Sequence, residues 1–250
     1  MQTVTDGLIT EYRKSGSGPV MLFLHGWGDS LKTFDMLSSQ FERAYTCIRL
    51  DLPGFGATEV PDGAWGLSDY AEFIRDFLVK LKVDKVTVLI GHSNGGAVAI
   101  KGLQTGALQA DQLILLSASG IRPKKTFKTT LITVGAKTGK QLAKLLPKAN
   151  QQAIRKAVYS RLGSDFLAAP HMADTFKRVV REDIRAGLGD VNIPVLLVYG
   201  EADTDTPLWI ARKFEKLLPQ ATLHITPLAG HFVHHDALAE TAHEIKGFLL

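Results

Sequence analysis

The sequence predicts an α/β fold with a mostly parallel, doubly wound central sheet. Short apolar runs alternate with segments of helical periodicity, which is typical of parallel strands joined by crossover helices. The alternation stops after Gly120 and resumes at Ile193, and the segment between them has helical patterns without a convincing strand. We therefore expect one α/β core, formed by residues 1–120 and 189–250, which carries a helical insertion of residues 121–188.

The first half of the chain contains the earliest candidate strands. Residues 8–13 alternate between apolar and polar side chains, which predicts an antiparallel strand. Continuous apolar runs predict strands buried on both faces at residues 20–24, 46–50, 86–90 and 112–117. Apolar spacing predicts helices over residues 32–43 and from Ser68, as N-cap, to about Leu81, and small side chains predict one over residues 97–100.

After the insertion the same rhythm returns. Residues 193–200 and 221–225 are apolar runs that predict two further strands. Pro207 suits the first turn of a helix because its ring fixes φ near the helical value. A closing helix is expected over residues 237–250.

One turn organises the chemistry of the chain. Gly91-His92-Ser93-Asn94-Gly95 matches the pattern G-x-S-x-G between an apolar strand and a helix of small residues. A serine there is forced into a strained turn, so glycines beside it avoid collisions with the neighbouring main chain. The turn pushes out the Ser93 hydroxyl and puts the N–H of Asn94 at the positive end of the helix. A nucleophile whose reaction generates an oxyanion needs this environment.

Five loops together resemble the α/β-hydrolase fold family over essentially the whole chain. They are His25-Gly26-Trp27, residues 51–56, residues 91–96, residues 200–203 and Gly230-His231-Phe232. The order of serine, aspartate and histidine along the chain also matches that family. The resemblance implies the α/β-hydrolase fold, with residues 121–188 as a helical lid inserted after the sixth strand. It points to the lid-containing esterase and lipase branch that uses a serine nucleophile.

The resemblance also implies a role for each site residue. Ser93 would be the nucleophile, His231 the general base, and Asp203 the carboxylate that orients the imidazole. The backbone N–H groups of Trp27 and Asn94 would form the oxyanion hole. Chemistry agrees, since a hydroxyl is a weak nucleophile near neutral pH and needs an adjacent, oriented base. Such a reaction requires no cofactor and no metal.

Other histidines compete with His231 for the role of base. His234 and His235 lie where the final helix should begin, so we expect them at the surface or as capping residues. His25 lies in the predicted oxyanion loop and is interpreted as a hydrogen-bonded structural residue. The side chain of His92 should point away from that of Ser93 on a tight turn.

Two carboxylates flank Asp203. Glu201 should lie next to the strand end, and Asp205 could cap the helix behind Pro207. The motif position favours Asp203 as the orienting acid. The loop at Asp51 is expected to be structural and to shape the rim beneath the site.

Composition excludes several classes of protein. The single cysteine, Cys47, lies in an apolar stretch and cannot form an internal disulfide. No apolar run approaches the ~20 residues that a membrane span needs, and the first residues do not resemble a signal peptide. We therefore expect a cytoplasmic protein. The sequence has no phosphate-binding P-loop and no cluster with metal-ligand spacing.

The predicted insertion is strongly basic. Residues 121–188 contain 15 Lys and Arg residues but four Asp and Glu residues, whereas the whole chain has a net charge of +4. A solvated basic face explains such a run without any partner. The functional interpretation is attraction to an anionic membrane, or to a phospholipid-like or thioester substrate. Aromatic residues are sparse among these charges, which disfavours nucleic acid.

The sequence therefore predicts a serine hydrolase that acts on a small ester or acyl substrate, as a carboxylesterase. The same triad could serve a C–C bond hydrolase of the meta-cleavage type or an acyltransferase, because the lid and water access separate these activities. A non-catalytic binding protein on this scaffold is the alternative from another class, since a fold does not guarantee activity.

Overall fold

The computed structural model describes residues 1–122 and 169–250. The chain divides into two compact units, one formed by residues 1–121 with 172–250 and the other by residues 122–171. Most of the predicted helical, basic lid, residues 123–168, lies outside the described residues. The lid and its boundaries at residues 121 and 188 therefore stay a prediction.

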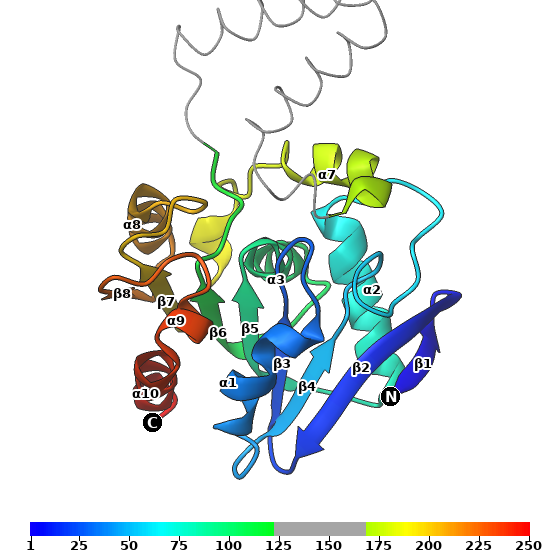
Figure 1. The fold of residues 1–250 in the computed structure, drawn as a ribbon, viewed down its shortest axis with the longest axis horizontal. Coiled ribbons are helices and arrows are strands. Elements are labelled where there is room, and N and C mark those ends of the chain that lie inside the picture. Colours follow the sequence, from blue (N-terminus) through cyan, green and yellow to red (C-terminus); the bar gives the residue numbers. More distant parts are fainter. Residues whose placement is uncertain (123–168) are drawn as a thin grey trace, which may run out of the picture. The chain divides into compact units, whose positions relative to one another are not determined.

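The described residues contain one sheet of eight strands in the order β1-β2-β4-β3-β5-β6-β7-β8 (Figure 1). The strands are β1 (Gln2–Thr5), β2 (Leu8–Gly16), β3 (Val20–Leu24), β4 (Thr46–Leu50), β5 (Val86–His92), β6 (Ala110–Leu116), β7 (Val195–Gly200) and β8 (Ala221–Thr226). β2 pairs antiparallel with β1 and β4, whereas every pair from β4 to β8 is parallel. The predicted α/β fold with a mostly parallel sheet is confirmed.

The apolar runs located the strands closely. β3 and β4 have the predicted bounds. The bounds of β5, β6, β7 and β8 differ from the predicted ones by at most a few residues. The antiparallel strand expected at residues 8–13 is β2. β1 was not predicted, because its four residues alternate weakly and pair along one edge of β2.

Helices and 3-10 turns connect these strands. They are η1 (Leu31–Phe34), α1 (Asp35–Ser39), α2 (Leu67–Lys80), α3 (Asn94–Thr105), η2 (Pro170–Met172), α7 (Ala173–Val179), η3 (Leu188–Asp190), α8 (Leu208–Leu217), α9 (Val233–Asp236) and α10 (Leu238–Phe248). No helix among the described residues is long and apolar enough to cross a membrane.

Two helix predictions need correction. The helix expected over residues 32–43 is a 3-10 turn followed by the short α1, although Phe34, Leu37 and Phe41 are all buried as their spacing required. Tight turns bury these side chains as well as a continuous helix would. Ser68 does not cap α2, because Gly66 is the N-cap and its N–H donates to the Asp69 carboxylate at 2.6 Å.

The central strands are covered on both faces, as a doubly wound sheet requires. Phe23, Ile90, Ile114 and Leu196 occupy register positions in line across β3, β5, β6 and β7. They share one apolar core with residues from η1, α1, α9 and α10. α2 and α3 contact each other, and α3 contacts β3, β5 and β6. Because the parallel strands point the same way, the loops at their carboxyl ends gather at one rim of the sheet.

Candidate active site

Ser93 lies in a strained turn between strand and helix. β5 ends at His92 and α3 begins at Asn94, and Ser93 between them has φ 49° and ψ −116°. A residue other than glycine with positive φ costs on the order of 1–3 kcal/mol, which the surrounding structure must compensate. His92 and Asn94 are buried, whereas Ser93 stays partly exposed. The turn therefore leaves Ser93 partly exposed between two buried neighbours.

The glycines around Ser93 are required by close main-chain packing. A Cβ atom on Gly91 would lie 2.5 Å from the Cα of Gly96, and one on Gly95 would overlap the carbonyl of Leu24. Distances this short are forbidden between non-bonded atoms, so side chains at these positions would force β5, α3 and β3 apart. This packing explains why the pattern needs glycine on both sides of the serine.

The loop after β3 lies directly against this turn. A Cβ atom on Gly26 would be 3.2 Å from the Cβ of Ser93 and 3.0 Å from Nδ1 of His92. The next residue, Trp27, packs its ring against Phe55 with 4.8 Å between ring centroids. The predicted oxyanion loop and the predicted nucleophile are therefore adjacent in the structure.

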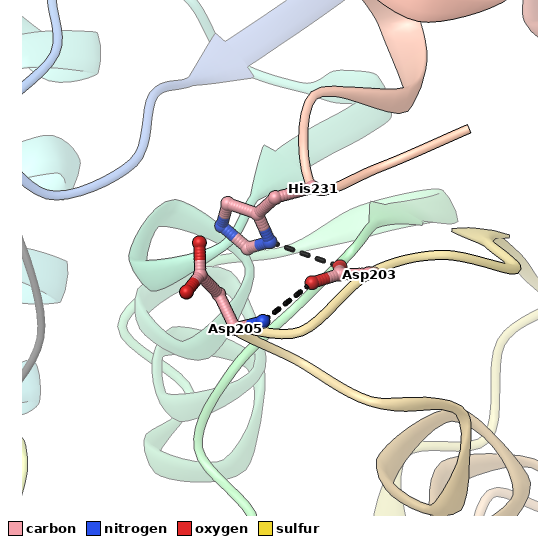
Figure 2. A group of neighbouring side chains, drawn as sticks. All are labelled: Asp203, Asp205 and His231. Atoms are coloured by element: carbon pink, nitrogen blue, oxygen red, sulfur yellow. Dashed lines mark hydrogen bonds and ion pairs between the residues drawn. The ribbon is translucent and has the colours of Figure 1, made fainter. Parts of the chain in front are cut away.

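A buried carboxylate and an imidazole form a pair at the same rim. Nδ1 of His231 donates to Oδ2 of Asp203 at 2.9 Å (Figure 2). The Asp203 side chain is fully buried and that of His231 is 13% exposed. The other carboxylate oxygen, Oδ1, accepts the backbone N–H groups of Asp205 and Thr206, each at 2.8 Å. These bonds hold Asp203 in a single orientation toward His231.

The hydrogen bonds also keep Asp203 ionised. Burial acts to raise the pKa of its carboxyl group, but the bonds from His231 and from the Thr206 hydroxyl and backbone outweigh burial and hold the pKa well below its usual range. A carboxylate can only accept, so Nδ1 of His231 carries the proton. Nε2 is then the nitrogen that can act as a base.

Asp205 lies beside the same imidazole. One oxygen of Asp205, one oxygen of Asp203 and one ring nitrogen of His231 lie within 4.8 Å of one another. Figure 2 draws the exposed Asp205 carboxylate on the side of the ring away from Asp203. Spacing in the sequence did not predict this group. The short bond between Asp203 and His231 needs a proton, whereas metal ligands must lose theirs, so the geometry fits an acid–base pair better than a metal site.

The structure places the competing residues as follows. Asp203, and not Asp205 or Glu201, is bonded to the His231 ring. Asp205 does not cap α8, whose N-cap is Pro207. His25 is buried with Nδ1 bonded to the carbonyl of Gly26 and Nε2 accepting the N–H of Leu52, as expected of a structural residue.

The Asp51 side chain has the structural role expected of its loop. Oδ1 accepts the N–H of Leu31 at 2.6 Å, and Oδ2 accepts the N–H of Ala57 at 2.8 Å. The carboxylate therefore ties the start of η1 to the loop after β4, beneath the rim.

The expectation for His234 was wrong. His234 is 1% exposed, stacks on Phe34 and bonds through Nε2 to the Thr33 hydroxyl at 3.1 Å. Its ring lies 4.7 Å from that of His92 and 4.4 Å from that of His235. α9 is a short separate helix that turns His234 into the core, which spacing along a single closing helix could not reveal. The signal in the sequence that could have indicated a buried histidine cluster is the presence of three histidines within residues 231–235.

These buried histidines should make the fold sensitive to acid. Burial, followed by the nearby His231, lowers the pKa of His92 from 6.5 to about 3, and burial also lowers the pKa of His234 and His25. As the pH falls through about 6.5, these three histidines therefore take up protons in the unfolded chain. In the folded chain they stay neutral at that pH. Stability from this source is complete above pH 6.5 and is lost as the pH falls toward the folded pKa values. Between pH 7 and pH 5 we expect a loss of about 2 kcal/mol for each histidine that stays neutral.

Urea unfolding at pH 7 and pH 5 measures this loss. The variant His234→Gln should lose less stability between the two values, while the exposed His243→Gln should behave like the wild type. Equal free energies of unfolding at pH 7 and pH 5 would contradict the expectation.

Known proteins resemble this chain over nearly its whole length. The family model described as the alpha/beta hydrolase family matches residues 21–244. The pimeloyl-[acyl-carrier protein] methyl ester esterase of Aliivibrio fischeri (strain ES114) is 25% identical, covering 95% of this chain and 96% of the relative. A membrane phospholipase A, described as a bacterial virulence factor, superposes on all of this chain and 84% of its own with a TM-score of 0.79 and 21% identity. The meta-cleavage product hydrolase of Pseudomonas fluorescens IP01 superposes on all of this chain and 97% of its own with a TM-score of 0.75 and 17% identity. The two structural matches show the fold.

Proposed function

Because this chain belongs to the alpha/beta hydrolase family, we propose that it is a serine hydrolase that cleaves a carboxylic ester through an acyl-enzyme on Ser93. The observation that carries this proposal is the buried Asp203–His231 pair at 2.9 Å. His92, the neighbour of Ser93, bonds to the main chain of His231 at 3.1 Å, which supports a single site formed by the pair and the strained turn.

The reaction proceeds in two halves. Nε2 of His231 takes the Ser93 proton as the hydroxyl oxygen attacks the ester carbonyl, and the carbonyl oxygen becomes an oxyanion. The backbone N–H groups of Trp27 and Asn94 stabilise that oxyanion. The imidazolium, held by Asp203, then gives its proton to the departing alcohol. Water, activated by His231, attacks the acyl-enzyme and releases the acid and the free serine.

The proposed substrate is a small ester or acyl compound. The proposed class includes anionic and lipid-like esters. A relative of this chain is named as a methyl ester esterase, which supports an ester. The resemblance to a phospholipase A agrees with a lipid-like substrate or contact with an anionic membrane, although the basic residues proposed to make that contact lie largely outside the described residues. A cytoplasmic location stays a prediction from the sequence.

A C–C bond hydrolase is the second candidate, favoured by the fold shared with the meta-cleavage product hydrolase. An acyltransferase would use the same acyl-enzyme with an alcohol or amine in place of water. A non-catalytic binding protein remains the alternative from another class, but such a protein would have no need to keep the Asp203–His231 pair.

A panel of p-nitrophenyl esters with acyl chains of increasing length tests the proposal. We expect turnover that peaks at one chain length, with no hydrolysis of a p-nitrophenyl phosphodiester, because the nucleophile and oxyanion hole suit a planar carbonyl. A fluorophosphonate probe should label the protein covalently. Cleavage of a meta-cleavage dienone without ester hydrolysis would favour the C–C bond hydrolase. If the probe does not label the protein and no substrate is turned over, the proposal that it is an enzyme is wrong.

A further inference from the structure

Three parts of the proposed site meet at one buried imidazole. His92 ends β5 directly before Ser93, its Nδ1 lies against Gly26 of the oxyanion loop, and its Nε2 bonds to the carbonyl of His231 at 3.1 Å. We propose that His92 is a positioning residue, whose hydrogen bond to the His231 main chain sets the imidazole of His231 relative to Ser93. This inference rests on the function proposed above and adds a residue that acts through His231, without touching the substrate.

The hydrogen bond defines the tautomer of His92. A backbone carbonyl can only accept, so Nε2 must carry the proton and donate it. Nδ1 is then a bare acceptor, and it is buried without a hydrogen-bond partner among the described residues. An apolar residue of similar size would avoid this cost of an unsatisfied acceptor. A histidine that served only to fill the core would therefore destabilise the fold relative to an apolar residue. The hydrogen bond that Nε2 donates to His231 is a reason for an imidazole at this position.

Burial keeps His92 in this neutral state. Burial, and then the nearby His231, lowers the pKa of His92 to about 3, so the ring is neutral near pH 7. The titratable groups that face it are His231, Asp203, His234 and His235. A neutral donor of fixed tautomer makes a bond that does not switch when His231 itself gains and loses a proton.

The position of the His231 loop explains why such a bond is needed. His231 lies between β8 and α9, outside any regular element. Asp203 holds the ring at Nδ1, and Asp236 accepts the N–H of Gly230 at 2.8 Å. Neither contact comes from the strand that carries Ser93. His92 links the loop to that strand, so the distance between base and nucleophile depends on it. A misplacement of ~1 Å in such a constellation costs about 10²-fold in rate.

Two substitutions of His92 separate positioning from packing. Glutamine can place an amide N–H near the position of Nε2, whereas methionine has similar bulk and no donor. We expect His92→Met to lower kcat for the best p-nitrophenyl ester about 10- to 100-fold with little change in KM. The rate of fluorophosphonate labelling should fall in parallel. His92→Gln should recover most of both rates, which a role in packing alone would not require.

The outcomes distinguish this inference from the proposed function. Wild-type protein that neither hydrolyses esters nor takes up the probe would defeat the function. Wild-type protein that does both, with His92→Met equally active or His92→Gln equally impaired, would defeat the positioning role alone. Nitrogen-15 NMR of histidine-labelled wild type gives a readout that needs no variant. The His92 ring should be the neutral Nε2–H tautomer from pH 8 to pH 5, and an Nδ1–H tautomer or a titration near pH 6.5 would overturn the inference.

Discussion

Replacing Ser93 with alanine should lower kcat for ester hydrolysis by about 10⁴- to 10⁶-fold and abolish fluorophosphonate labelling. The change removes only the hydroxyl, so His231 and Asp203 keep their bond and the acyl-enzyme cannot form. Some substrate binding should remain, because the oxyanion donors belong to the backbone. The measurement is kcat with the best p-nitrophenyl ester, together with mass spectrometry of the probe-treated protein.

Ser117 offers a matched control for this substitution. Ser117 directly follows β6, as Ser93 directly follows β5, and it also has positive φ, at 45°. Its hydroxyl is buried without a hydrogen-bond partner among the described residues. Ser117→Ala should therefore leave kcat and labelling close to wild type. Undiminished labelling of Ser93→Ala would mean that the proposed nucleophile is wrong.

Replacing Asp203 with asparagine should lower kcat by about 10⁴-fold while the fold survives. Oδ1 of Asp203 accepts two backbone N–H groups, from Asp205 and Thr206, so the amide oxygen of the new side chain must take that place. The amide NH2 group then faces Nδ1 of His231, which must become the acceptor. The proton moves to Nε2, and a protonated Nε2 cannot take the proton of Ser93.

Asp205→Asn is the control for the orienting acid. It makes the same chemical change at an exposed carboxylate beside the same imidazole, but it breaks no hydrogen bond to the ring. We expect a kcat within a few-fold of wild type. A loss in Asp205→Asn as large as that in Asp203→Asn would transfer the proposed role to Asp205.

The parts of the site that could be predicted from the sequence are those with a local signal. The motif around Ser93 depends on glycines whose neighbours are close in the chain or in the adjacent strand, so the pattern carries its own steric reason. Asp203 and His231 were predicted from the order of five loops. Their pairing at 2.9 Å agrees with that prediction, while their roles stay a proposal that the variants above test.

The environment of His92 and His234 could not be predicted in the same way. Spacing put His234 at the start of a helix on the surface, but α9 breaks from α10 and turns the ring into the core beside His92. The bond of His92 joins residues that are 139 positions apart in the chain. No periodicity in a single sequence encodes a contact over that separation.

The sequence by itself determined the positions of β2 to β8 along the chain, the turn at Ser93 and the set of residues that could share an active site. Apolar runs and glycines can be interpreted from the sequence because the strands and tight turns that they form depend on residues close together in the chain. Only the tertiary structure decided the order of the strands in the sheet, the pairing of β1 with β2, which nitrogen of His92 carries a proton and which histidines are buried. These outcomes depend on how loops from distant strands come together at one rim of the sheet, where burial and hydrogen bonds set the state of each group.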